Sequence, residues 1–120
     1  MEVEERLTRV LGGWAVGSVA TGAVLALHPR SRSFGRQTAA WGAVDGAIAW
    51  AGARKRARTG PTDPARLRRV LLVNAGLDVG YLAAGAALVR HGRWPGDGWA
   101  VVVQGAFLLV LDSAAARALR

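Results

Sequence analysis

The chain has 120 residues, of which 52% are hydrophobic and 20% charged, and its 16 Lys and Arg against 8 Asp and Glu give a net charge of +8. It contains no cysteine, which excludes disulfides, zinc–thiolate sites and cysteine nucleophiles. The length suits one domain, or two small repeats of one. The bases flank apolar segments, so membrane topology and anionic lipid explain the positive charge better than nucleic acid, and no nucleic-acid partner is predicted.

Charge is almost absent from four segments of the chain, residues 10–27, 37–53, 70–89 and 98–116, which contain three acids and no base. Each segment reaches the length of about 17 to 25 residues that a membrane-spanning helix needs. We therefore predict an all-α membrane protein whose four transmembrane helices form an antiparallel four-helix bundle. The alternative is a soluble Ala/Gly-rich bundle. It needs polar outer faces, and segment 10–27 offers only Trp14, Ser18 and Thr21 for one.

The bases are divided unevenly between the two ends of the predicted bundle. Eleven of them lie at the end that holds both termini and the central loop 54–69, and five lie at the opposite turns. The positive-inside rule therefore predicts a multi-pass protein of a bacterial cytoplasmic membrane with both termini in the cytoplasm. The basic loop 54–69 offers a site for anionic lipid, with simple solvation as the alternative.

The central loop leads into a helix start. In TDPARLRR, Thr62 or Asp63 is expected to cap the helix and Pro64 to be its first residue. The two outer loops, HPRSRSFG and RHGRWPGDG, are short. Each should join antiparallel neighbours, which makes the fold two helical hairpins.

The second half of the chain resembles the first when it is shifted by 63 residues without gaps. VGSVATGAVLALHPR (16–30) aligns with VGYLAAGAALVRHGR (79–93), and identities continue to Arg54 and Arg117. We interpret this as a duplication with repeat 1 at 6–54, a linker at 55–68 and repeat 2 at 69–117; composition bias is the alternative. The copies should share one orientation and be related by a pseudo-two-fold axis along the membrane normal.

Small residues four apart predict close helix packing, because dispersion at short backbone distances drives association in lipid. Packing within the bundle is the favoured interpretation and a homodimer seam the alternative. The motifs are Gly13/Gly17, Ser18/Gly22, Gly42/Gly46 and Gly76/Gly80.

Polar side chains recur at helical spacing on one face of each segment, and in lipid such faces can only point inward. At about 1.5 Å per residue, one layer should hold Ser18, Asp45 and Asp78, with Asn74 and Asp112 just beneath it and Gln37, Trp41 and Gln104 in the outer half. No Lys or Arg lies within the segments to neutralise the acids. We therefore expect a protonated or cation-bound carboxyl among them.

This polar layer supports two functional hypotheses. The first is a binding site for a small or amphipathic ligand, or a relay for a proton or ion. The second is a non-catalytic structural or partner-stabilising protein, whose buried Asp, Asn and Gln only fix helix packing. The acids are not mirrored by the repeat, which favours the first. The candidate residues are Asp45, Asp78, Asn74, Asp112, Gln104, Ser18, Trp41, Gln37 and Tyr81.

No enzyme motif of the G-x-S-x-G, H-E-x-x-H, P-loop or dinucleotide type is present, so catalysis is not predicted. His28 and His91 occupy equivalent outer positions and could ligate a metal or haem iron. We interpret them instead as interfacial residues near the turns, and predict no cofactor. Trp41 lies deeper and is expected to line a cavity, whereas anchors in the aromatic belt are predicted at Trp14, Trp50, Trp94 and Trp99.

Three stretches, FGRQTAAWGAVDGAIAW, NAGLDVGYLAAG and GDGWAVVVQGAFLLVLD, resemble a family of small, uncharacterised four-helix bacterial membrane proteins. The similarity covers nearly the whole chain. It implies a membrane bundle, and it implies no catalytic activity.

Overall fold

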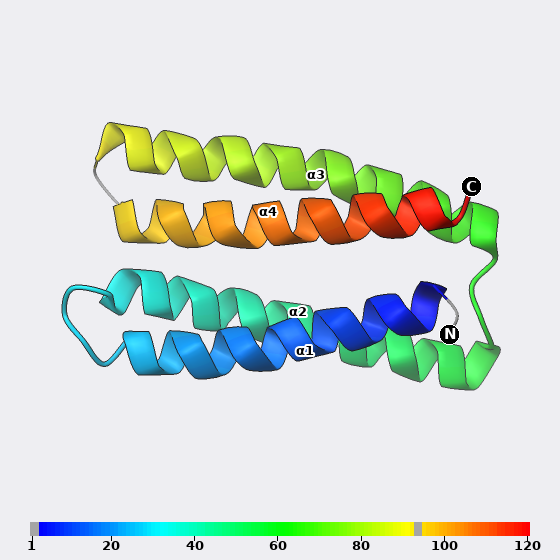
Figure 1. Ribbon diagram of the computed structural model, residues 1–120. Helices are drawn as coiled ribbons and strands as arrows, with labels where there is room; N and C mark the ends of the chain where they lie inside the picture. The colour runs from blue at the N-terminus through cyan, green and yellow to red at the C-terminus, as the bar shows by residue number, and fades with distance from the viewer. Residues whose placement is uncertain (1–2, 93–94) are drawn as a thin grey trace.

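The computed structural model describes residues 3–92 and 95–120, and it places them in four α-helices without a β-strand among these residues. The helices pair as two antiparallel hairpins, α1 with α2 and α3 with α4 (Figure 1). The start of α1, the end of α4 and the linker between the hairpins lie at one end of the bundle. The predicted all-α four-helix fold is therefore confirmed, with α1 at Val3–Leu25, α2 at Arg32–Thr59, α3 at Pro64–His91 and α4 at Pro95–Ala118.

Helix α2 is longer than the apolar segment that predicted it, because the Ala, Arg and Lys residues that follow are good helix formers. It ends at Gly60, whose φ of 79° favours glycine and whose N–H donates to the Arg56 carbonyl oxygen at 2.8 Å. The Asp63 side chain accepts from the Arg66 N–H at 3.2 Å and Pro64 follows as the first helical residue, as predicted. The non-helical segment between α2 and α3 is thus residues 60–63.

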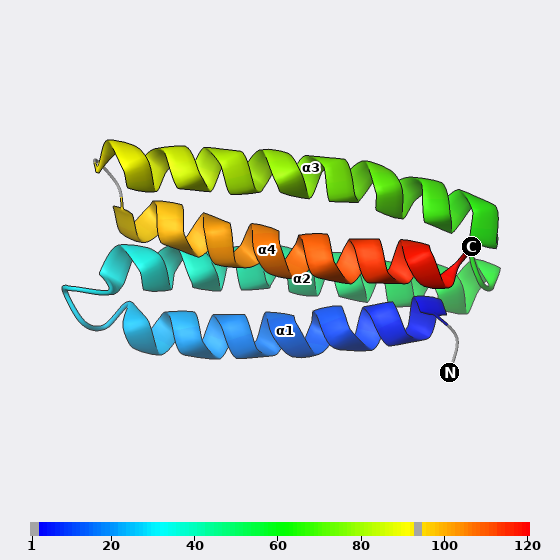
Figure 2. The same ribbon diagram turned by 45° about the horizontal axis from the view of Figure 1, so that its top comes forward.

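The two hairpins meet mainly along α4. Helix α4 packs against α2 and, over a shorter contact, against α1, whereas α2 and α3 make no close backbone approach within the described residues. Figure 2 shows α4 lying between α3 and the first hairpin. The bundle is therefore skewed, and its α2–α3 side is left more open than its α1–α4 side.

Glycines set the close approach inside each hairpin. A Cβ at Gly22 would lie 2.5 Å from the Gly35 carbonyl oxygen, and one at Gly85 would lie 2.9 Å from the Gly98 carbonyl oxygen. The motif glycines Gly13, Gly17, Gly76 and Gly80 were expected to pack within the bundle, but they have open space around their Cα atoms. For these two motifs the expectation is wrong, because the four residues lie on outward-facing sides of α1 and α3. It is confirmed for Ser18/Gly22 and Gly42/Gly46, which pack between α1 and α2.

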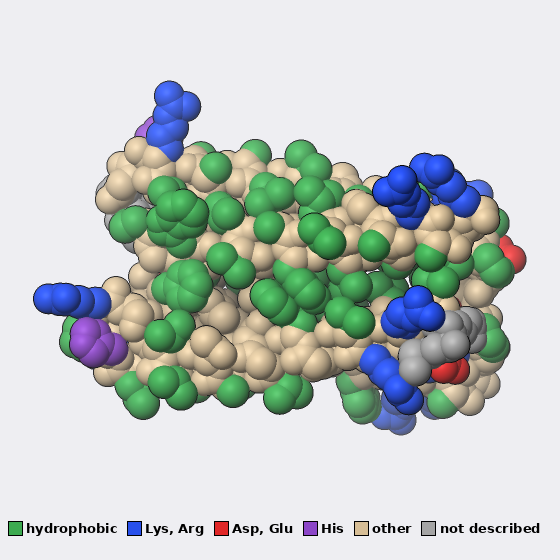
Figure 3. Space-filling view, in the orientation of Figure 1, with side chains coloured by type: hydrophobic (Ala, Val, Ile, Leu, Met, Phe, Trp, Pro, Cys, Tyr) green, Lys and Arg blue, Asp and Glu red, His purple; other side chains and the backbone are tan. Residues whose placement is uncertain are grey.

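Burial is inverted relative to a water-soluble bundle. The buried apolar residues are mostly alanines, while large aliphatic side chains such as Val16, Val24 and Ile48 are more than half exposed. The polar residues Ser18, Asp45, Asp78, Gln104 and Asp112 are buried instead. Figure 3 shows Lys and Arg gathered toward the two ends of the visible face, with hydrophobic side chains between them.

By length and composition, two helices of the described chain, α3 and α4, could cross a membrane. Helices α1 and α2 do not meet the same measure, because their central parts carry glycine, alanine, serine and threonine in place of large aliphatic residues. Four spans were expected, and two of the described helices are apolar enough for one.

Candidate functional site

Three carboxyl groups from three helices meet inside the bundle. Asp45 on α2, Asp78 on α3 and Asp112 on α4 are 1%, 3% and 8% exposed. Asp78 lies near both other carboxyl groups, and all three side chains line one cavity.

Two oxygens of this cluster have no hydrogen-bond partner. Asp45 Oδ2 and Asp78 Oδ2 are buried and unpaired within the described residues. Leaving a buried carboxyl oxygen unpaired costs about 1–3 kcal/mol or more, so native structures rarely keep one without a reason.

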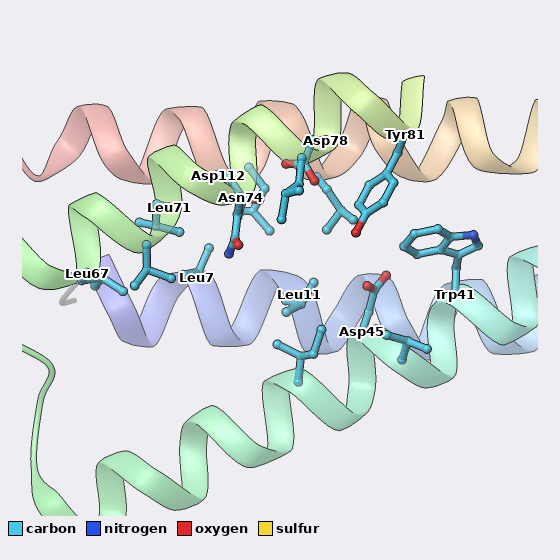
Figure 4. Close-up of a pocket in the computed structure, with 16 residues that line it drawn as sticks. Leu7, Leu11, Trp41, Asp45, Leu67, Leu71, Asn74, Asp78, Tyr81 and Asp112 are labelled. Atoms are coloured by element: carbon cyan, nitrogen blue, oxygen red, sulfur yellow. The ribbon is translucent and has the colours of Figure 1, made fainter. Parts of the chain in front are cut away.

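Asp45 and Asp78 line a cavity of about 270 Å³. All four helices contribute to it, and Figure 4 shows the labelled residues around the space. Four lining residues are acidic or amide, and the rest are aliphatic or aromatic. The lining consists of Leu7, Leu11, Trp41, Val44, Asp45, Ile48, Leu67, Val70, Leu71, Asn74, Leu77, Asp78, Tyr81, Leu108, Leu111 and Asp112.

Two aromatic rings close one end of the cavity. The rings of Trp41 on α2 and Tyr81 on α3 meet edge to face, with centroids 5.2 Å apart and planes at 67°. In Figure 4 the Tyr81 hydroxyl and the Asp45 carboxyl point toward each other, with the Trp41 ring beside them. Trp41 therefore lines a cavity, as the sequence predicted.

The cavity opens sideways between α2 and α3. Val44, Ile48, Val70 and Leu77 line it, yet each of these side chains is about half exposed on the outer surface. These two helices have no close backbone approach, which leaves an apolar mouth rather than a sealed wall.

The opposite side of the bundle is closed by a hydrogen-bonded network. Gln104, fully buried on α4, accepts from Trp14 Nε1 at 2.8 Å and donates from Nε2 to Ser18 Oγ at 3.2 Å. The Trp14 ring stacks on Phe107 with centroids 3.8 Å apart and planes at 6°. Trp14 is thus an interior residue and its assignment to the aromatic belt is wrong. Gln104 shares a layer with Ser18 instead of lying farther out.

The remaining predicted residues lie apart from the cavity. Gln37 is half-buried on α2 and is not among the lining residues. His28 and His91 are exposed at the turn of each hairpin, where His28 Nδ1 accepts from the Arg30 N–H at 3.2 Å. Within the described chain, no three His, Cys, Asp or Glu side chains form a group that could hold a metal ion. Trp94 lies outside the described residues.

One contact at the linker end has no signal in the sequence. Glu4 on α1 is buried, and its carboxylate accepts from the Thr62 N–H at 3.0 Å and from Thr62 Oγ1 at 3.3 Å. It lies in a groove of about 310 Å³ that also includes Lys55 and Arg66 and adjoins the acid-lined cavity through shared leucines. Residues 58 positions apart have no periodic relation, so this bond could not be read from the pattern.

Fold and site together define a small all-α protein of four helices with a buried acidic centre. The chain belongs to the family of unknown function DUF6992, whose model matches residues 10–113 and so includes all three central acids. This agrees with the resemblance to an uncharacterised four-helix family. Comparison with curated proteins and with solved structures gave no match.

Proposed function

We propose that this protein is an integral membrane bundle whose central cavity binds a small, partly apolar ligand through Asp45 and the Asp78–Asp112 pair. One observation carries the proposal: Asp45 and Asp78 line a cavity whose walls are mostly hydrocarbon, and each has a buried oxygen without a hydrogen-bond partner among the described residues. A network that only fixed helix packing would pair these atoms.

The inverted burial supports a membrane environment. Large aliphatic side chains cover the outside, and the acids and Gln104 lie inside. If α3 and α4 cross the bilayer, α1 and α2 cross beside them, because the two hairpins run side by side over the same length (Figure 1). The bundle is 45 Å long, more than the roughly 30 Å hydrocarbon layer, so its charged ends reach the headgroups.

The orientation and the internal repeat are part of the same proposal. The end with the linker carries most of the bases and faces the cytoplasm of a bacterial cell, where Arg54 to Arg69 contact anionic lipid.

The glycine pairs Gly22–Gly35 and Gly85–Gly98 lie at corresponding positions of the two halves, which supports a duplication with repeats at 6–54 and 69–117.

Native mass spectrometry of the detergent-purified protein tests the ligand. We expect the wild type to carry an added mass that Asp78→Asn loses, because the amide removes one of the three carboxyl groups that line the cavity. Asp97→Asn, at the start of α4 and outside the cavity, is the matched control and should keep the added mass. Identical ligand-free masses for the wild type and Asp78→Asn contradict the proposal. Loss of the protein from membranes at alkaline pH contradicts the membrane assignment.

The second candidate function is structural, and the Trp14–Gln104–Ser18 network favours it on the α1–α4 side. There the polar atoms named above are bonded and the aromatic rings are stacked, as expected of groups that fix helix register. In this case the protein would stabilise a membrane partner or its own assembly, and the acids would contribute to folding stability.

A further inference from the structure

We propose that the ligand is a hydrophobic organic cation, whose charged group lies between the Asp45 carboxylate and the rings of Trp41 and Tyr81. The inference rests on the proposed function, because it names the ligand class of the same cavity. Four features of the cavity carry it: its charge, the arrangement of its acids, its aromatic end and its mouth.

The charge of the lining excludes an anion. Three carboxyl groups line the cavity and no Lys, Arg or His does so. Asp45 faces the cavity with no basic side chain in the lining, and its Oδ2 has no hydrogen-bond partner among the described residues. A buried carboxylate with no positive partner is costly, and a bound cation removes that cost. Lys55 and Arg66 line the adjoining groove nearer the linker, where an anionic group would bind instead.

The arrangement of the acids favours an organic cation over a metal ion. Ca²⁺ and Mg²⁺ need six or more oxygen ligands that converge within about 2.0–2.6 Å. The three acids do not form such a group in the described residues, and leucines and valines make up most of the remaining wall. An alkylated ammonium spreads its charge over carbon substituents, and so it needs one carboxylate and apolar contact rather than a shell of oxygens.

The aromatic end supplies a second attraction for such a group. Trp41 and Tyr81 lie edge to face, so a cation beside Asp45 meets π-electron density as well as the carboxylate. Cation–π contacts of desolvated ammonium groups with tryptophan and tyrosine are among the stronger recognition elements for this chemistry. The facing residues of the other helices, Leu11 and Leu108, add only hydrocarbon.

The mouth determines how the ligand arrives and how large it can be. Val44, Ile48 and Leu77 form an apolar opening between α2 and α3, so a ligand with an apolar body can enter sideways from the hydrocarbon layer. Entry from the linker end would pass Lys55 and Arg66, which repel a cation. A volume of about 270 Å³ limits the ligand to a small amphiphile.

Calorimetry in lipid nanodiscs with two probes of equal shape tests the inference. Phenyltrimethylammonium and its neutral isostere tert-butylbenzene differ in one charge, and empty nanodiscs correct for partitioning into lipid. We expect the cation to bind the wild type at least about tenfold more tightly than the isostere. Equal affinities, or binding of neither probe, overturn the inference. The proposed function has its own test, because it is contradicted if no added mass in native mass spectrometry depends on Asp78.

Variants locate the charged group. Asp45→Asn should abolish the tenfold preference for the cation, and Trp41→Leu should weaken cation binding about three- to tenfold while leaving the isostere unchanged. Trp50→Leu is the matched control, because this tryptophan lies on the same helix, 63% exposed and outside the cavity. A cation preference that survives Asp45→Asn overturns the placement at Asp45. The comparison of the two probes on the wild type stands even if a variant fails to fold.

Discussion

The two seams between the hairpins occupy corresponding positions but have opposite character. On the α1–α4 side, a stacked ring pair and a buried amide close the seam. On the α2–α3 side the seam is a cavity with an apolar mouth. A shift of 63 residues places the closing residues Trp14, Ser18, Gln104 and Phe107 opposite the cavity-lining residues Leu77, Tyr81, Trp41 and Val44.

The repeat positions show that the acids belong to only one of the two seams. The acids around the cavity stand opposite alanine or leucine under the same shift, since Asp78 corresponds to Ala15 and Asp45 to Leu108. A symmetric bundle would need these acids on both sides if they were required for packing. We interpret the closed seam as the part that fixes the fold and the open seam as the part that serves the function.

The largest expected effect on unfolding free energy comes from substituting glycines inside the hairpins, where the two halves of the chain should behave alike. In Gly22→Ala and Gly85→Ala the new methyl group meets backbone atoms at 2.5 and 2.9 Å, so the helices must move apart. We expect each to lose about 3 kcal/mol or more of unfolding free energy, measured by SDS titration in mixed micelles. Gly17→Ala and Gly80→Ala have open space and should be neutral or slightly stabilising. A large loss of unfolding free energy in only one of these two variants would mean that the two hairpins are not packed alike.

The next largest effect on stability should differ between the two seams. Gln104→Leu leaves the Trp14 N–H and the Ser18 hydroxyl without their partner, and it should cost about 2–3 kcal/mol of unfolding free energy. Trp41→Leu, at the corresponding position, should cost about 1 kcal/mol, because its ring borders a cavity and makes no side-chain hydrogen bond in the described structure. Thermal unfolding followed by circular dichroism measures both. Equal losses would mean that the α2–α3 seam is as tightly closed as the other.

Much of this architecture could be predicted, because in a chain of this composition one physical rule dominates. Charged side chains avoid apolar surroundings, so segregation of charge marks the helices, and helical spacing marks the inward faces. The predicted inward residues Ser18, Asp45, Asp78, Gln104 and Asp112 are all buried. The cap at Asp63 followed from local backbone chemistry.

The seams could not be predicted, because they depend on how each helix is rotated against helices distant in sequence. Trp14 shares a face with Ser18, but Phe107 stacks on its ring only because α4 packs against both α1 and α2. The same position leaves α2 and α3 apart and opens the cavity. The outward glycines show the limit of motif reasoning, because Gly13 and Gly17 have the spacing for close packing and no helix against them.

The smallest expected effect decides whether the acids serve folding or binding. Asp45→Leu introduces the residue found at position 108, and it removes a buried carboxyl whose Oδ2 has no partner. The added methyl groups point into an existing cavity, so the variant should gain about 1 kcal/mol of unfolding free energy in the same SDS titration while losing the copurified ligand. Asp45→Asn is the control, with a polar group of the same size and little change in stability. A loss of stability in Asp45→Leu would make Asp45 part of the packing network, and the two seams would then differ in shape alone.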